Sequence, residues 1–222
     1  MKKLLMLMVA LLVVGTVNAA PWVIDDFEGY ADDTELQAAW VMNTSSDIST
    51  ETLEPVLNGN SMLITNASQG PAYYTQTKYA MPGAVHDDHG VNLTYQGHDT
   101  ITMTFAIPPN GGSDPYDGLG GSGGDVFLSM YDCWGQKVFE ASYAGDVTPS
   151  GTGWPDGIVW EMAFADCIVG GMNLENVEHI TVGYNKEYYG AGCLFVDDIV
   201  LTPEPATIAI LGLGGLMLRR RK

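Results

Sequence analysis

The central part of this sequence almost lacks basic residues. Only Lys78, Lys137 and Lys186 lie between residues 21 and 202, a segment that holds 26 acidic residues and so has a formal charge of −23. Proteins that bind nucleic acids neutralise phosphates with clustered Lys and Arg. The scarcity of cations therefore argues strongly against a nucleic-acid partner. The hydrophobic fraction of 46% nevertheless predicts a folded domain rather than a disordered chain.

The N-terminus lacks an apolar run of the ~20 residues that cross a bilayer. Residues 1–19 instead combine Lys2 and Lys3 with a short apolar run over 4–14 and small residues at Val17 and Ala19. This pattern is typical of a secretory signal peptide, and we expect signal peptidase to cleave after Ala19. A membrane anchor is the alternative, which the short run disfavours.

The other end of the sequence also has only a short apolar run, and three features follow one another there. They are the motif Pro203-Glu204-Pro205, apolar residues 206–218, and the basic cluster 219–222. The positive-inside rule predicts a short tail that pauses in the inner membrane with its cluster on the cytoplasmic side. This order resembles the PEP-CTERM sorting signal of Gram-negative bacteria. The resemblance implies transient inner-membrane association, then cleavage by an exosortase and release to the cell surface or extracellular matrix; a plain tail anchor is the alternative. The residues that carry it are Pro203, Glu204, Pro205, Arg219, Arg220 and Arg221.

Cysteine is scarce and its number is odd. Cys133, Cys167 and Cys193 allow at most one internal disulfide, and any of the three pairings remains open. Their spacing fits no zinc motif.

Helix signals are scarce as well. Residues 33–40 predict two turns of helix, capped by Asp33 or Thr34. Residues 172–177 predict a single turn of helix. Strand signals separated by Gly, Pro, Asn and Asp recur instead. They cover residues 22–28, 61–66, 72–80, 99–107, 126–131, 137–143, 158–165, 179–184 and 193–202. We therefore expect one all-β domain over 20–202, an antiparallel β-sandwich of the jelly-roll type, flanked by an N-terminal signal helix and, within 203–222, a hydrophobic tail helix.

Three short segments carry a second resemblance. They are Ile24–Tyr30, Asn58–Ile64 and Gly192–Leu201. Their order is similar to that in galactose-binding-like jelly rolls, especially the carbohydrate-binding modules of bacterial surface proteins. The resemblance implies a structural Ca²⁺ where the first and last strands meet. The implied ligands are Glu28, Asp197 or Asp198, and carbonyls from Asn58 to Ser61, with Asp26 nearby. Calcium takes 6–8 oxygen ligands, and a cation offsets the repulsion of close carboxylates. Acids that simply point to solvent are the alternative.

Two other segments have residues suited to metal binding. The glycine-rich segment 108–125 contains one copy of a Ca²⁺-binding β-roll motif, but that architecture needs many copies, so we expect a long loop. Its Asp114, Tyr116 and Asp117 stay weak binding candidates. His86-Asp87-Asp88-His89 is flanked by Gly and Pro, which favours an exposed loop over a metal site.

Aromatic residues in turns are the candidates for ligand binding. Trp134 and Trp154 stand beside glycine, and Tyr116 and Tyr188 lie in similar polar contexts. Exposed aromatic rings near Asp and Asn are suited to stacking on sugars, whereas packing beneath loops is the alternative. Trp40 and Trp160 have apolar neighbours and are expected in the core.

Catalytic motifs are absent. The sequence has no G-x-S-x-G, no H-E-x-x-H and no Cys–His signature. We therefore expect a non-catalytic surface or matrix protein that binds a neutral polysaccharide. A structural matrix protein without a small ligand and a polysaccharide-active enzyme are the two alternatives, and an enzyme would need two carboxylates ~5–10 Å apart in a cleft.

Overall fold

The computed structural model describes most of the domain and neither terminal segment. The described residues are 20–42, 49–54, 57, 59–66, 74–85, 88–94, 98–107, 126–143, 157–185 and 192–203. The predicted signal helix and tail helix lie outside them, as do Ala19, Glu204, Pro205 and the arginines of the basic cluster. Within the described part of the chain, no helix is long and apolar enough to cross a membrane.

The described chain consists of strands with two short helices. The strands are β1 (Trp22–Asp25), β2 (Trp40–Met42), β3 (Ser49–Glu54), β4 (Ser61–Asn66), β5 (Tyr74–Ala80), β6 (His98–Ala106), β7 (Val126–Asp132), β8 (Lys137–Tyr143), β9 (Ile158–Ala163), β10 (Val177–Asn185) and β11 (Gly192–Pro203). The helices are α2 (Asp33–Ala39) and α3 (Phe164–Cys167).

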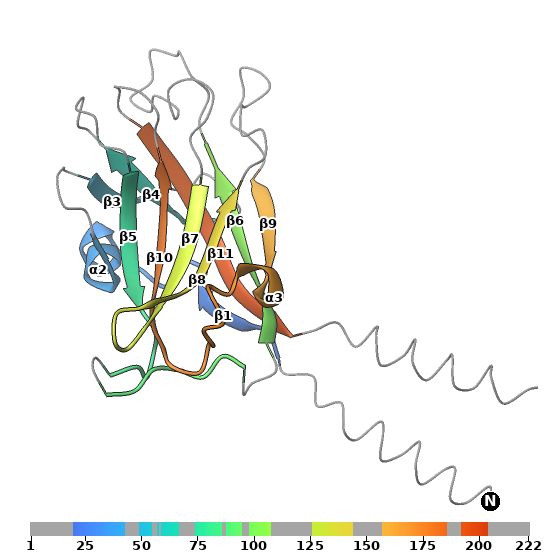
Figure 1. The fold of residues 1–222 in the computed structure, drawn as a ribbon. Helices are drawn as coiled ribbons and strands as arrows, with labels where there is room; N and C mark the ends of the chain where they lie inside the picture. Colours follow the sequence, from blue (N-terminus) through green and yellow to red (C-terminus); the bar gives the residue numbers. More distant parts are fainter. Residues whose placement is uncertain are drawn as a thin grey trace, which may run out of the picture.

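The strands form two antiparallel sheets that pack face to face (Figure 1). The six-stranded sheet has the order β3-β4-β11-β6-β9, and β1 also pairs with β11. The five-stranded sheet has the order β2-β5-β10-β7-β8. The expected all-β sandwich of the jelly-roll type is therefore confirmed.

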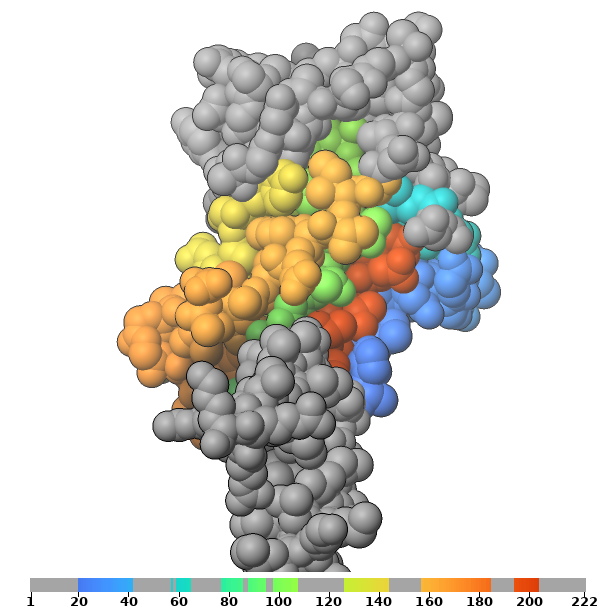
Figure 2. Space-filling view, turned by 90° about the vertical axis from the view of Figure 1, so that its right-hand side faces the viewer, coloured from blue at the N-terminus to red at the C-terminus, as the bar shows by residue number. Residues whose placement is uncertain are grey.

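The core lies between the sheets, and the alternation in β6 shows why. Ile101, Met103 and Phe105 are fully buried in the core, because successive side chains of a strand point to opposite faces. The threonines between them lie on the outer face of the six-stranded sheet. Figure 2 looks onto this face, on which β11 (red) lies between β6 (green) and β1 (blue).

Several local details differ from the sequence-based expectation. The predicted strand 158–165 ends at Ala163, because the next residues form α3 (Phe164–Cys167). The N-cap of α2 is Asp32 rather than Asp33 or Thr34, because its carboxylate accepts hydrogen bonds from the Thr34 and Glu35 amides. Residues 172–176 form an irregular, bent segment instead of a helical turn, and Val177 already belongs to β10. Strands β2 and β3 were not predicted. The last strand continues through Pro203, which pairs with His98.

One end of the sandwich gathers several connections. β1 and β11 are antiparallel neighbours, so both chain ends leave the domain at this end. The β7–β8 turn and the segment from α3 to β10 lie at the same end, at the bottom of Figure 1. The candidate pocket is formed by these last two connections.

Candidate functional site

A tight turn between β7 and β8 presents Trp134 to solvent. Asp132 organises this turn, because its Oδ1 accepts hydrogen bonds from the backbone amides of Trp134 (3.0 Å) and Gln136 (2.7 Å). Gly135 has φ +77°, a conformation that glycine adopts without strain. Asp132 itself is buried, whereas Trp134 is 60% exposed. The turn therefore places a large aromatic ring on a rigid base, as its glycine-flanked context had suggested.

The segment that leads into β10 forms the other side of the site. The backbone amide of Cys133 donates a hydrogen bond to the carbonyl of Asn176 (3.1 Å), which ties the two segments together. The amide of Val169 binds the carbonyl of Val138 (3.1 Å) and continues this attachment along β8. Residues 171–176 are thus held against the turn by backbone hydrogen bonds.

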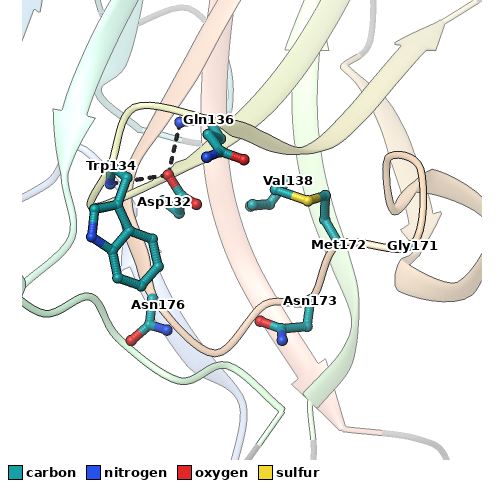
Figure 3. A pocket seen from close by; sticks show the side chains of 8 residues that line it. All are labelled: Asp132, Trp134, Gln136, Val138, Gly171, Met172, Asn173 and Asn176. Atoms are coloured by element: carbon teal, nitrogen blue, oxygen red, sulfur yellow. Dashed lines mark hydrogen bonds between the residues drawn. The ribbon is translucent and has the colours of Figure 1, made fainter.

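Between these segments lies a cavity of about 390 Å³. Figure 3 shows its arrangement, with Trp134 on one side and Val138 and Met172 on the opposite side. The remaining lining residues are Asp132, Gln136, Gly171, Asn173 and Asn176. Its volume falls within the ~300–1,000 Å³ that is usual for small-molecule sites.

The polar groups of the cavity are mostly amides, and two of these are available. Among the described residues, the side-chain amides of Gln136 and Asn176 have no hydrogen-bond partner. Asn173 caps its own turn by accepting a hydrogen bond from the Glu175 amide (3.1 Å). A primary amide can donate and accept at once, which is what a sugar hydroxyl requires of its partner.

None of the described residues that line the cavity is basic. The nearest cation in the sequence, Lys137, forms a 2.7 Å ion pair with Glu140, and this hydrogen bond raises the pKa of the lysine. A carboxylate and three amides therefore set the polarity of the pocket. Such a site suits an uncharged polar ligand better than an anion.

Sequence reasoning found one residue of this pocket and missed the others. Trp134 was singled out because of its glycine neighbour. Gln136, Asn173 and Asn176 carry no local signal, and only the pairing of the turn with residues 171–176 reveals them. The other ligand-binding candidates, Trp154, Tyr116 and Tyr188, lie outside the described residues, as do Asp114 and Asp117. Trp40 is fully buried and Trp160 half-buried against the core, as expected.

The outer face of the five-stranded sheet holds a second group of polar and aromatic residues. The rings of Tyr131 and His179 stack with centroids 4.8 Å apart and an interplanar angle of 11°. His179 Nδ1 lies 3.1 Å from a carboxylate oxygen of Glu178. The neighbouring Thr181 is fully buried, and its hydroxyl has no hydrogen-bond partner in the described part of the protein. This group does not line the Trp134 pocket.

The residues expected to bind calcium lie where β11 changes partners. β4 pairs with β11 up to Val196, and β1 pairs with it from Ile199 onward. Asp197 and Asp198 lie between these two pairings, and Asp198 has φ +47°. The bulged backbone therefore turns away from the regular ladder at this position.

Glu28 and the segment before β4 lie close together. Glu28 Oε1 accepts a hydrogen bond from the Asn60 amide (2.7 Å), and a Cβ at Gly59 would come within 1.8 Å of the same oxygen. Asp26 Oδ1 accepts from the Glu28 amide (3.2 Å), and Asp197 Oδ1 accepts from the Asp198 amide (2.8 Å). Asp197 and Ser61 are buried, and Asn58 lies outside the described residues. Within the described ranges, no three His, Cys, Asp or Glu side chains are close enough together to bind a metal ion.

Asp25 belongs to the core rather than to this acidic group. Its Oδ2 accepts hydrogen bonds from the Trp40 indole (2.8 Å) and the Tyr30 hydroxyl, and its Oδ1 accepts from the Phe27 amide (2.8 Å). Burial, followed by the hydrogen bond to Asp25, raises the pKa of Tyr30 above its usual value of 10.0. Both carboxylate oxygens of Asp25 are thus used within the fold.

The remaining candidates form no further site among the described residues. Asp88 and His89 are exposed and lie 3.5 Å apart, whereas His86 and Asp87 are outside the described ranges. Cys133 and Cys167 are free thiols, so neither forms a disulfide. Burial, and then the charge of Asp166, raise the pKa of the Cys167 thiol.

Comparison with known proteins identifies the fold. No protein-family model and no curated protein matches the sequence. Among solved structures, the chain is similar to a family 11 carbohydrate-binding module from Clostridium thermocellum in complex with a β-1,3-1,4-mixed-linked tetrasaccharide. The TM-score is 0.54 at 16% identity, covering 82% of this chain and 95% of the module. A family 28 module specific for non-crystalline cellulose gives a TM-score of 0.53 at 13% identity, covering 83% of this chain and 96% of the module.

A similar sandwich also occurs as part of an enzyme. An arabinose-bound GH51 α-L-arabinofuranosidase gives a TM-score of 0.53 at 14% identity, covering 84% of this chain but only 27% of the enzyme. At these identities the likeness defines the architecture alone. The chain has the jelly-roll sandwich that is found in carbohydrate-binding modules.

Proposed function

We propose that this chain is an exported, non-catalytic carbohydrate-binding protein whose Trp134 pocket binds a neutral glycan. The observation that carries the proposal is the pocket itself, in which an exposed indole stands beside the Gln136 and Asn176 side-chain amides, which have no hydrogen-bond partner among the described residues. The jelly-roll architecture supports it, since the similar modules include one solved with a bound tetrasaccharide.

The chemistry of the pocket matches the two kinds of surface that a sugar presents. The C–H face of a pyranose stacks on an aromatic ring, and its hydroxyls exchange hydrogen bonds with amides. The formal charge of −23 over residues 21–202 disfavours acidic polysaccharides, because like charges repel at long range. A neutral glycan can stack and form hydrogen bonds in this way, and it carries no charge that the protein would repel.

A glycan screen tests this proposal. The protein should bind at least one neutral oligosaccharide, and Trp134→Ala should lower the affinity by ten-fold or more, because stacking on the indole is lost. Val159→Ala is the matched control, since Val159 is a 70% exposed apolar residue on the opposite sheet. The absence of any neutral-glycan binding would contradict the proposal and favour a structural matrix role instead.

The proposal includes a structural calcium ion near the β11 bulge. Glu28, Asp197 or Asp198, and backbone carbonyls before Ser61 would be its ligands, with Asp26 nearby. The contact of Glu28 with the Gly59–Asn60 backbone supports this placement. A ligand of the native state stabilises it by RT ln(1 + [L]/Kd), about 2.7 kcal/mol at a hundred-fold excess. Calcium should therefore raise the melting temperature of chelated protein, and Glu28→Gln should abolish the increase. An unchanged melting temperature in the parent would refute the ion.

Export rests on the two terminal segments. Signal peptidase would cleave after Ala19, and an exosortase would act at the Pro203-Glu204-Pro205 motif while residues 206–218 and the following arginines hold the chain in the inner membrane. Replacement of the motif should leave the protein in the membrane fraction. Release of this variant as efficient as that of the parent would reject the sorting role.

A further inference from the structure

The two sides of the Trp134 pocket differ in a way that limits how a glycan can lie in it. On one side Trp134 is 60% exposed and borders open solvent. On the opposite side the wall is formed by Val138, which is 2% exposed and part of the core, and by Met172, which packs against that core. Figure 3 shows these two walls facing each other across the cavity. The pocket thus has one open side and one side closed by the protein interior.

The polar residues lie between these two walls. In Figure 3, Gln136 and Asp132 lie on one flank of the cavity, and Asn173 and Asn176 on the other. The Gln136 and Asn176 side chains have no partner among the described residues, so they are available to ligand hydroxyls. Asp132 Oδ1 is already used by the Trp134 and Gln136 amides. Amides on opposite flanks can therefore contact hydroxyls on both edges of one sugar ring.

We infer that the pocket recognises the end of a neutral glycan chain, and this inference rests on the function proposed above. The terminal residue occupies the cavity between the amides, and the next residue stacks on Trp134 at its mouth. An internal residue would need the chain to leave the cavity on two sides, and the Val138–Met172 wall closes one of them. The binding site therefore contacts about two sugar residues, one inside the cavity and one on the Trp134 ring.

The rigidity of the site favours this selectivity. The turn is held by the two hydrogen bonds that its backbone amides donate to Asp132. Residues 171–176 are held by the backbone hydrogen bond between Cys133 and Asn176. Val138 is part of the core and Met172 packs against that core, so this wall cannot move aside without exposing apolar surface. A chain that lacks a free end is therefore excluded by shape and not only by a missing hydrogen bond.

The experiment compares free and blocked chain ends. The probes are neutral gluco-, galacto- and manno-oligosaccharides of increasing length, each with free ends and with both ends O-methylated, titrated by calorimetry. We expect affinity to rise from the monosaccharide to the disaccharide and then to level off. The number of protein molecules bound per polymer chain should not depend on polymer length, and blocking the ends should weaken binding by ten-fold or more.

Variants separate this inference from the proposed function. Gln136→Leu should weaken binding of free-ended oligosaccharides by about three- to ten-fold, the loss of one hydrogen bond, while leaving the blocked-end probes unchanged. Tyr131→Ala, on the outer face of the five-stranded sheet, should change the affinity for neither the free-ended nor the blocked-end probes. Binding that increases in proportion to polymer length and is lost in Trp134→Ala would overturn end recognition but keep the proposed function. Binding to no neutral glycan, or binding that Trp134→Ala leaves intact, would overturn both.

Discussion

Two turns in this protein begin with the same side-chain hydrogen bond and have opposite surroundings. Asp25 and Asp132 each end a strand, and each accepts a hydrogen bond at Oδ1 from the amide of an aromatic residue two positions later, Phe27 or Trp134. Phe27 is fully buried, whereas Trp134 is 60% exposed. The shared hydrogen bond therefore does not determine the environment of the ring that follows.

The difference comes from what covers each turn. After the Asp25 turn the chain continues into α2 and β2, which bring Trp40 back to donate to the second carboxylate oxygen of Asp25. Trp40 also stacks on Tyr79 with ring centroids 4.9 Å apart. The Asp132 turn leads directly into β8, and Trp134 stays at the surface beside a polar cavity. The first turn is part of the core, and the second lies at the proposed binding site.

The largest expected effect lies at the covered turn. Trp40→Ala should lower the free energy of unfolding by about 3–5 kcal/mol, because it removes a fully buried indole and one of the three hydrogen-bond donors to the Asp25 carboxylate. Trp40→Phe should cost less, since it keeps most of the packing and loses only the N–H donor. Urea denaturation measures both. A loss below ~1 kcal/mol for Trp40→Ala would mean that Trp40 does not stabilise the Asp25 turn, which would then be no more buried than the Asp132 turn.

Alkaline pH should weaken the covered turn selectively. The pKa of Tyr30 is raised by burial and by its hydrogen bond to Asp25, and the pKa of Tyr79 is raised by burial and by the charge of Asp25. The unfolded chain therefore loses these protons first, so the contribution of these two tyrosines to stability should be constant below pH ~10 and fall as the pH rises above it. Denaturation across this range should show a shallower decline in Tyr30→Phe. An identical decline in the variant would contradict the role of Tyr30.

A smaller loss is expected at the open turn. Asp132→Ala removes the acceptor for two backbone amides at a partly covered position, so it should cost about 1–3 kcal/mol. Asp132→Asn keeps a side-chain oxygen and should retain most of the stability. The denaturation midpoints of the two variants provide the test. Equal losses in both would mean that charge, rather than the acceptor, stabilises the turn.

The sequence carried enough information for the architecture because strand periodicity is a local property. In β6 the alternation of Thr with Ile101, Met103 and Phe105 predicts which side chains enter the core, and the structure agrees. β3 was missed because its sequence, STETLE, is mostly polar and is recruited by pairing with β4. β2 was missed because Trp40 continues the helical pattern of α2.

The site was predictable only where one residue carried the signal. Trp134 stands beside a glycine in a turn, which is visible locally. The Gln136 and Asn176 amides line the same cavity only because β7, β8 and β10 are neighbours. The amide of Cys133 in the turn donates to the Asn176 carbonyl, 43 positions further along the sequence. The Asp25–Trp40 bond likewise depends on the return of the chain through α2. Contacts of this kind are set by tertiary structure rather than by local pattern.

Thermal unfolding of Trp134→Ala should show the smallest change in stability. Its ring is mostly in contact with solvent, and the turn bonds involve the backbone, so the free energy of unfolding should stay within ~0.5 kcal/mol of the parent. This is the opposite of the expectation for Trp40→Ala. A decrease of several kcal/mol in the free energy of unfolding would mean that the Trp134 ring packs against the protein rather than facing solvent.

The most direct test is a calorimetric titration of neutral oligosaccharides into the parent protein, Trp134→Ala and Val159→Ala. We predict that the parent and Val159→Ala bind the same oligosaccharide with equal affinity and that Trp134→Ala binds it at least ten-fold more weakly while remaining folded. Equal affinity in all three proteins, or no binding in the parent, would contradict the assignment of the Trp134 pocket as a glycan-binding site.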